Sequence, residues 1–364
     1  MKTLDDNSPF EHTRPVTPPI FAGRSKELKI INNALYENKD SLILFGNDAI
    51  GKSSIIKTIY ENLNLTKQRQ ILPVWFSAFD FIKAVECDFL GLTIRQICGT
   101  IWTECIKKSY SILLENDLAG SKTELFQSPE ENALVRIFRL VSNEKFTGSG
   151  KSSKEIGGKI GLEGKISREN EIGKERKSFA TFEFLYLVDE LNGIINSFGF
   201  QSIIVFCDEL NHLPEIINTE ILRNYFSIFS SKKIQFVIVA VNPEMSRKED
   251  ARQLIESFNY QLEIGPFKKI EDVKELVKNS SSLLKHKIEF EDECIDFLFK
   301  NTEGHPWWIQ KICDSTYAIA LIKKFDKIDI SLIEKCYLDY QDEILIYKNR
   351  IAAGLPFRKR NLNQ

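Results

Sequence analysis

A chain of 364 residues, 43% hydrophobic and 27% charged, has the composition of a globular protein with room for more than one domain. Its net charge of −2 gives no overall attraction for nucleic acid, so such binding would need a local basic patch. The seven cysteines are scattered and odd in number, which favours reduced side chains. No signal core and no stretch of ~20 apolar residues is found, so we expect a cytoplasmic protein without membrane contact.

The chain opens with polar, proline-rich residues 1–20, which predict an extended lead-in. Residues 21–28 then open a predicted amphipathic helix that runs to residue 35. Near-continuous apolar runs, typical of strands buried on both faces, predict strands at residues 42–45, 71–77, 203–207, 234–241 and 260–264. Helical patterns at roughly 89–114 and 129–142 lie between them, which indicates a parallel sheet with helices on both sides. Pro73 favours a sheet edge for the second strand.

The first predicted strand runs straight into the pattern GxxxxGKS and then into a helical pattern, which is the context that a P-loop requires. In such a loop, backbone N–H groups at a helix N-terminus surround phosphate oxygens. Lys52 would reach the β- and γ-phosphates of ATP, and the Ser53 hydroxyl would bind Mg²⁺. The candidate nucleotide-binding residues are Gly46, Asn47, Asp48, Ala49, Ile50, Gly51, Lys52, Ser53 and Ser54.

Acidic and amide side chains follow two of the later strands. Asp208 at the end of the third strand is expected to bind Mg²⁺ as a Walker-B carboxylate. Glu209 beside it is placed to polarise the attacking water. Asn242, after the fourth strand, would face the same crevice and orient that water, although Asn-Pro is also an ordinary turn starter.

Residues 147–178 interrupt the domain with a glycine-rich, lysine-rich segment whose apolar residues recur with period 2. This pattern predicts a β-hairpin or a mobile flap. Residues 150–153 imitate the end of a P-loop, but no apolar strand precedes them. The segment carries more basic than acidic side chains, so it is the candidate for a local basic surface, with a merely solvated loop as the alternative.

From residue 269 the pattern becomes helical, and we predict a lid domain at 269–340, followed by a tail at 341–364. The α/β domain would then occupy residues 21–268. Pro306 stands at a predicted helix start, and Trp307 and Trp308 would anchor that helix against the α/β core. Capping-box spacing at residues 331–334 predicts a last short helix.

Together these segments resemble the AAA+/STAND P-loop ATPases, in particular their origin-recognition-like and archaeal-type branch. The resemblance rests on the P-loop, the Walker-B acids, residues 21–28 (FAGRSKEL) and residues 303–306 (EGHP). It implies an ASCE-type parallel sheet with a C-terminal helical lid, and it adds nucleotide contacts at Phe21, Gly23, Arg24 and Pro306. No sensor-2 arginine stands in the lid, where His305 and Lys311 occupy that neighbourhood. An arginine finger cannot be assigned among Arg223, Arg247 and Arg252.

The sequence therefore favours an ATP-hydrolysing switch that uses ATP and Mg²⁺ and acts on a partner protein or on a DNA-associated or antiviral defence complex. A homo-oligomer and an effector in trans are the expected partners. The first alternative is a nucleotide-dependent binding module, which would be insensitive to the loss of Glu209. The second is a small-molecule phosphotransferase, disfavoured by the long helical lid and the acidic pair. A GTPase is disfavoured because residues 38–40 (NKD) precede the P-loop.

Overall fold

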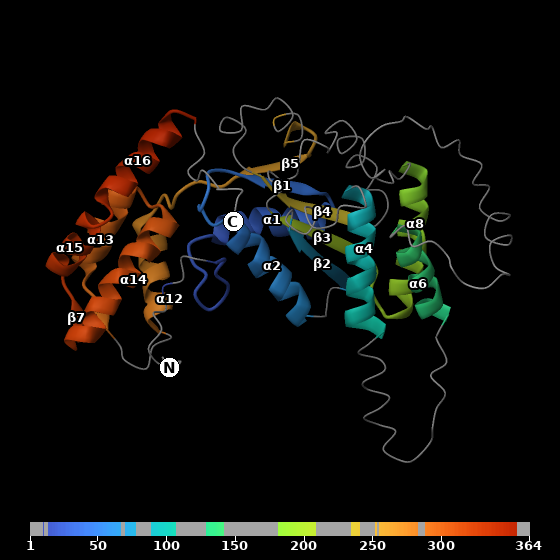
Figure 1. Ribbon diagram of the computed structural model, residues 1–364, viewed down its shortest axis with the longest axis horizontal. Helices are drawn as coiled ribbons and strands as arrows, with labels where there is room; N and C mark the ends of the chain where they lie inside the picture. Colours follow the sequence, from blue (N-terminus) through green and yellow to red (C-terminus); the bar gives the residue numbers. More distant parts are fainter. Residues whose placement is uncertain are drawn as a thin grey trace, which may run out of the picture. The chain divides into compact units, whose positions relative to one another are not determined.

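The computed structural model describes residues 10, 14–66, 70–77, 89–106, 129–141, 181–208, 234–240, 252, 255–282 and 288–354. The chain divides into two compact units, one of residues 1–82 with 195–364 and the other of residues 83–194. The first unit contains every described strand and the C-terminal helices (Figure 1). The predicted flap at 147–178 lies outside the described residues.

A five-stranded parallel sheet forms the centre of the first unit. Its order is β2-β3-β4-β1-β5. The strands are β1 (Leu42–Phe45), β2 (Ile71–Ser77), β3 (Ser202–Asp208), β4 (Ile234–Val239) and β5 (Tyr260–Glu263). The predicted strands and their parallel pairing are confirmed, and so is the edge position of β2, where Pro73 removes a backbone donor.

The central strands are buried because their sequences are almost wholly apolar. Every residue of β4 is buried, including Gln235. Its amide donates hydrogen bonds to the carbonyls of Leu35 (2.9 Å) and Asp40 (3.3 Å), which compensate the cost of burying a polar group. Helices α1 (Ser25–Asn32) and α2 (Lys52–Thr66) and the π-helical turn η2 (Asn33–Glu37) pack into the same apolar cluster as the strands. This cluster holds the phosphate loop on a rigid base.

The second unit is helical in its described part. It contains α4 (Phe89–Ile101), the π-helical turn η3 (Trp102–Ile106), α6 (Pro129–Val141) and most of α8 (Thr181–Ser197). The Arg95 guanidinium lies 5.7 Å from the ring centre of Phe138, and Arg136 forms a 2.7 Å ion pair with Glu190. Of the helix predicted at 89–114, residues 89–101 form α4, and the chain continues as a π-helical turn from Trp102 to Ile106. Residues 107–114 lie outside the described ranges.

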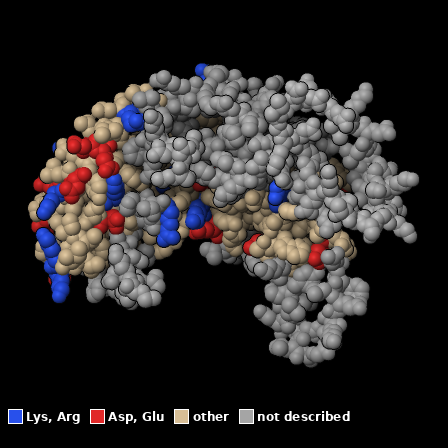
Figure 2. Space-filling model, viewed as in Figure 1, with Lys and Arg blue, Asp and Glu red and all other residues tan. Residues whose placement is uncertain are grey.

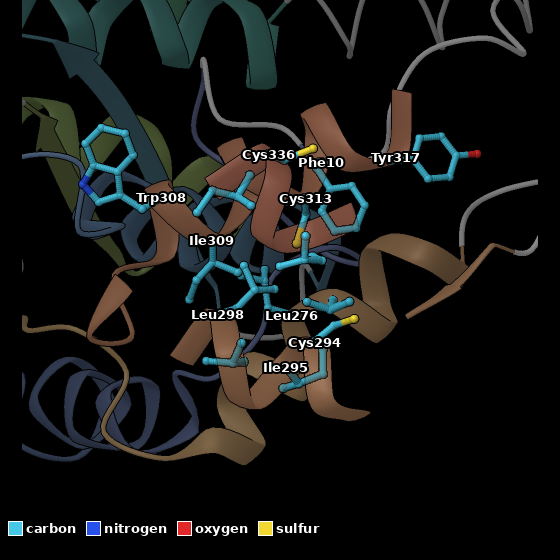
Figure 3. Close-up of a cluster of buried hydrophobic side chains, with 14 of the residues drawn as sticks. Phe10, Leu276, Cys294, Ile295, Leu298, Trp308, Ile309, Cys313, Tyr317 and Cys336 are labelled. Carbon is cyan, nitrogen blue, oxygen red and sulfur yellow. The ribbon is translucent and has the colours of Figure 1, made fainter. Parts of the chain in front are cut away.

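The C-terminal helices share one apolar cluster, shown in Figure 3, and we call them the lid. They are α12 (Ile270–Ser282), α13 (Asp292–Thr302), α14 (Pro306–Lys323), α15 (Ile330–Leu338) and α16 (Gln341–Ala352). A short parallel pair, β6 (Glu289–Phe290) and β7 (Lys327–Ile328), departs from the all-helical expectation. Acidic and basic side chains are interspersed on the lid surface (Figure 2), as in the 2.6 Å pair Lys274–Asp292.

Four details of the lid differ from the sequence-based expectations. The N-cap of α15 is Asp329, whose carboxylate accepts from the Leu332 N–H at 3.0 Å, so Ser331 does not cap the helix. A further helix, α16, follows where a tail was expected, and its Tyr347 is buried in the lid cluster. Trp308 packs in that same cluster and not in the cluster of the sheet. Phe10, from the expected lead-in, is buried there as well (Figure 3).

None of the helices within the described ranges is both long enough and apolar enough to cross a bilayer.

Candidate functional site

The phosphate loop connects β1 to α2, and its backbone depends on glycine at two positions. Gly46 and Gly51 have φ angles of 150° and 95°, and Ala49 lies between them in the left-handed region at 58°. A Cβ at Gly46 would stand 2.2 Å from the carbonyl oxygen of Ile264, so no larger residue fits. Around Gly51 no atom lies within 4 Å of such a Cβ. The loop is thus tight against Ile264, just after β5, at its start and open at its end, where the N–H groups of α2 begin.

Lys52 is the first residue of α2, and its side chain turns back over the loop. Its ammonium donates to the carbonyls of Gly46 (2.9 Å) and Asn47 (2.6 Å). The side chain is only 7% exposed. A buried ammonium held at the mouth of a loop of backbone donors is suited to bind phosphate oxygens, which would compete with these carbonyls for the same protons.

Ser53, in the helix that follows β1, contacts Asp208 at the end of β3, although β4 lies between β1 and β3 in the sheet. The Ser53 hydroxyl donates to Asp208 Oδ1 at 3.0 Å, and Asp208 is 7% exposed at the end of β3. A hydroxyl and a carboxylate beside a phosphate loop form an oxygen donor set that fits Mg²⁺, which binds one or two protein oxygens and keeps its remaining positions for phosphate and water. The two residues that the sequence analysis assigned to the metal therefore lie together.

We expect Asp208→Asn to weaken the Mg²⁺ dependence of nucleotide binding, because the substitution keeps the shape and the bond to Ser53 but removes the charge. Nucleotide affinity would be measured with and without Mg²⁺. The wild-type protein should bind the nucleotide more tightly when Mg²⁺ is present. In the variant, the increase in nucleotide affinity caused by Mg²⁺ should be about tenfold smaller, since a contact that involves a charged group contributes roughly 1.5–3 kcal/mol. An unchanged Mg²⁺ effect would remove Asp208 from the metal site.

Two of the proposed catalytic residues cannot be placed. Glu209 follows directly on the end of β3, and Asn242 follows β4, but both lie outside the described residues. Their roles therefore rest on their positions in the sequence.

Arg24, which the resemblance assigned to nucleotide contact, binds protein backbone. Its guanidinium donates to the carbonyls of Ile50 (2.9 Å) and Gly265 (2.8 Å) and pairs with Glu27 at 3.0 Å. It also lies 4.7 Å from the ring centre of Phe267. Burial lowers the pKa of Arg24 from its usual value, and the carboxylate of Glu27 opposes this effect. Arg24 thus joins the phosphate loop to the segment between β5 and α12.

The segment before α1 runs along the phosphate-loop helix. The Val16 N–H donates to the Ser54 hydroxyl at 3.1 Å, and the Gly23 N–H donates to Glu275 of α12 at 3.2 Å. Gly23 has a φ of 70°, and a Cβ there would come within 2.8 Å of Asp272. Phe21 packs on the cluster of the sheet and accepts a 3.5 Å hydrogen bond from Asn279 of the lid. These residues link the phosphate-loop helix with α12.

Gly304 and His305 bring the start of α14 to the phosphate loop. Gly304 accepts a 2.9 Å hydrogen bond from the Phe267 N–H, and a Cβ on Gly304 would lie 2.2 Å from the Phe267 carbonyl oxygen. His305 is the N-cap of α14, ahead of Pro306 at the first helical position. Its Nε2 lies 2.8 Å from the Tyr347 hydroxyl.

Burial lowers the pKa of His305 to about 3, and the charges of Arg24 and Lys52 act in the same direction, whereas a hydrogen bond with the Asp48 backbone opposes them. The imidazole is therefore neutral at neutral pH. Burial also raises the pKa of Tyr347, and the negative charge of Asp48 adds to this, while a hydrogen bond with the Asn47 side chain lowers it. Both side chains thus lie beside the phosphate loop.

Other candidates from the sequence have partners elsewhere. The Lys311 ammonium pairs with Glu343 at 2.7 Å and lies 4.3 Å from the ring centre of Tyr340, so it interacts within the lid. Arg252 is exposed and pairs with Glu256 at 2.8 Å. Arg223 and Arg247 lie outside the described ranges. Sequence reasoning missed Tyr347, although the helical spacing of Ile344, Tyr347 and Ile351 could have predicted α16.

Comparison with protein-family models and with curated protein sequences found no match. Solved structures give weak likenesses. Orc1 of Aeropyrum pernix in complex with DNA has a TM-score of 0.48 at 11% identity, over 92% of this chain and 68% of that one. The RuvB Holliday junction branch migration motor of Thermotoga maritima has 0.45 at 13%, over 94% and 80%. Domain III of the Thermotoga maritima replication initiation protein DnaA has 0.42 at 12%, over 93% and 98%.

The fold follows from the molecule's own geometry. A phosphate loop joins β1 to α2, and β4 separates β1 from the strand that ends in Asp208. Asp208 nevertheless reaches the loop serine, and a helical lid follows the sheet. With this strand order and this loop, the chain has the parallel sheet of an ASCE-type P-loop NTPase, followed by a C-terminal helical lid.

Proposed function

We propose that this protein is an ATP-binding and ATP-hydrolysing switch of the AAA+/STAND type. The observation that carries the proposal is the 3.0 Å hydrogen bond between Ser53 and Asp208, next to the buried ammonium of Lys52. A phosphate cradle, a cation and an oxygen donor set for Mg²⁺ are the components that phosphoryl transfer requires, because the protein contributes mainly position and charge.

The lid supports a switch in which nucleotide state changes the lid position. Arg24 joins the phosphate loop to the segment between β5 and α12, and Gly304 of the lid bonds the same segment at Phe267. His305 of the lid lies beside Asp48 of the loop, so a change at the loop can be passed to the lid helices. We further propose that the protein acts in the cytoplasm, forms homo-oligomers, and controls an effector protein in trans or a DNA-associated or antiviral defence complex. Its net charge of −2 does not support general nucleic-acid binding.

The proposal is tested by measuring phosphate release from ATP and ATP affinity in the wild-type protein and in Glu209→Gln. If Glu209 polarises the attacking water, the variant should bind ATP within a few-fold of wild type but hydrolyse it at least about a hundredfold more slowly, as expected for removing a general base. Mg²⁺-dependent hydrolysis by the wild-type protein is the required positive result.

The other results separate the alternatives. Tight ATP binding with no turnover in either protein would favour a nucleotide-dependent binding module. Turnover that appears only when a small acceptor molecule is added would favour a phosphotransferase. Failure of the wild-type protein to bind any nucleoside triphosphate would overturn the proposal.

A further inference from the structure

The phosphate loop and the lid meet at Asn47, whose backbone and side chain bond different partners. Lys52 donates to the Asn47 carbonyl at 2.6 Å, and the Asn47 side chain bonds the Tyr347 hydroxyl. That hydroxyl lies 2.8 Å from His305 Nε2. These contacts begin at the cation expected to bind the β- and γ-phosphates and end in the lid.

Tyr347 belongs firmly to the lid. Its ring packs edge-on against His305, with centroids 4.8 Å apart, and against Trp308, at 6.2 Å. Its helix α16 is held by ion pairs of Lys348 with Glu303 (2.8 Å) and of Glu343 with Lys311 (2.7 Å). The side chain is 6% exposed. Its ring is thus fixed to the lid, and its hydroxyl reaches Asn47 of the phosphate loop.

A phosphate group in the loop competes with the Asn47 carbonyl for the protons of Lys52. Any movement of Lys52 toward phosphate changes the hydrogen bonding of Asn47, and Asn47 is the residue that Tyr347 holds. We propose that Tyr347 is a positioning residue that, through Asn47, couples the occupancy of the phosphate loop to the position of the lid. This inference rests on the proposed function, since it assumes that a nucleotide binds the loop.

The test uses the full chain and follows tryptophan emission. The Trp308 ring lies against the Tyr347 ring, and the ring centroids of Trp307 and Trp308 are 4.4 Å apart. Emission is compared with ADP and with a non-hydrolysable ATP analogue, and binding of each is measured separately by calorimetry. The wild-type protein should show different emission with the two nucleotides. Tyr347→Phe, which keeps the ring, should lose this difference while its affinities change by no more than about tenfold, the value of a single hydrogen bond.

Tyr340→Phe is the matched control. Its hydroxyl bonds Ser315 of α14 at 2.6 Å, so this variant loses a hydrogen bond inside the lid but none to the phosphate loop. It should keep the emission difference. Asn47→Ala breaks the same connection from the other end, and where it still binds nucleotide it should behave as Tyr347→Phe does, with no further loss in the double variant.

The outcomes separate the two proposals. If the wild-type protein binds neither nucleotide, the proposed function fails first. If it binds both and Tyr347→Phe retains the wild-type emission difference, the coupling role of Tyr347 is overturned while the proposed function stands. If Tyr340→Phe loses the difference as well, the effect arises from general loosening of the lid, and the coupling role is also overturned.

Discussion

Lys52→Ala should abolish ATP hydrolysis and weaken ATP binding more than any other single change in the phosphate loop. The ammonium is 7% exposed and already lies within hydrogen-bond distance of two loop carbonyls. A charge-assisted bond contributes about 1.5–3 kcal/mol, so its loss should reduce ATP affinity by about tenfold to a hundredfold. Hydrolysis should fall further, by at least about a hundredfold, because the charge that develops during phosphoryl transfer would lose its main protein cation.

Lys57→Ala is the control for this prediction. Lys57 lies on the same helix α2 and is half-buried, but it is outside the loop motif. ATP affinity is measured by calorimetry and hydrolysis by phosphate release, with circular dichroism to show that both variants fold. Affinity and turnover in Lys52→Ala equal to those of Lys57→Ala would mean that the loop does not bind the phosphates of ATP.

The sheet could be predicted from sequence because each strand carries its own signal. Buried strands of a parallel sheet are apolar along nearly their whole length, as in residues 203–207 and, apart from Gln235, in residues 234–239. Pro73 even indicated the edge strand, since a residue without an N–H cannot pair on both sides. The meeting of Ser53 and Asp208 also followed, because the loop that leads to Ser53 and the residue Asp208 both stand at the carboxyl ends of parallel strands.

The contacts between the lid and the loop could not be predicted in the same way, because the partner of each side chain is set by the tertiary fold. Arg24 stands in a motif associated with nucleotides, yet its hydrogen bonds go to the backbone at Ile50 and Gly265. Tyr347 lies about 300 residues from Asn47 in sequence and has no local motif. Phe10 looks like one apolar residue in a polar lead-in, and only the fold buries it in the lid.

Capping shows how a correct pattern can give the wrong residue. Residues 331–334 have the spacing of a capping box, but Asp329 stands two positions earlier and caps α15 instead. Both Asp and Ser are good N-caps, so composition alone does not choose between them. The helix begins at Ile330, two residues after β7 ends at Ile328, and the tertiary position of that strand decides the cap.

Gly304→Ala should be the most destabilising small substitution at the junction of the sheet and the lid. A Cβ would stand 2.2 Å from the Phe267 carbonyl oxygen, and the residue has a φ of 70°. The left-handed backbone costs a non-glycine residue about 1–2 kcal/mol. Overpacking costs a further 1–3 kcal/mol or so. We therefore expect a loss of about 3 kcal/mol, measured as the change in unfolding free energy by urea denaturation with tryptophan emission as the probe.

Gly199→Ala separates the two costs. Gly199 has a φ of 86°, but no atom lies within 4 Å of its added Cβ, so only the backbone cost of about 1–2 kcal/mol applies. The excess loss in Gly304→Ala then measures how tightly the lid is held against Phe267, whose N–H bonds the Gly304 carbonyl at 2.9 Å. Equal losses in the two variants would show that this contact yields without cost, and a lid attached so loosely could not transmit the state of the phosphate loop.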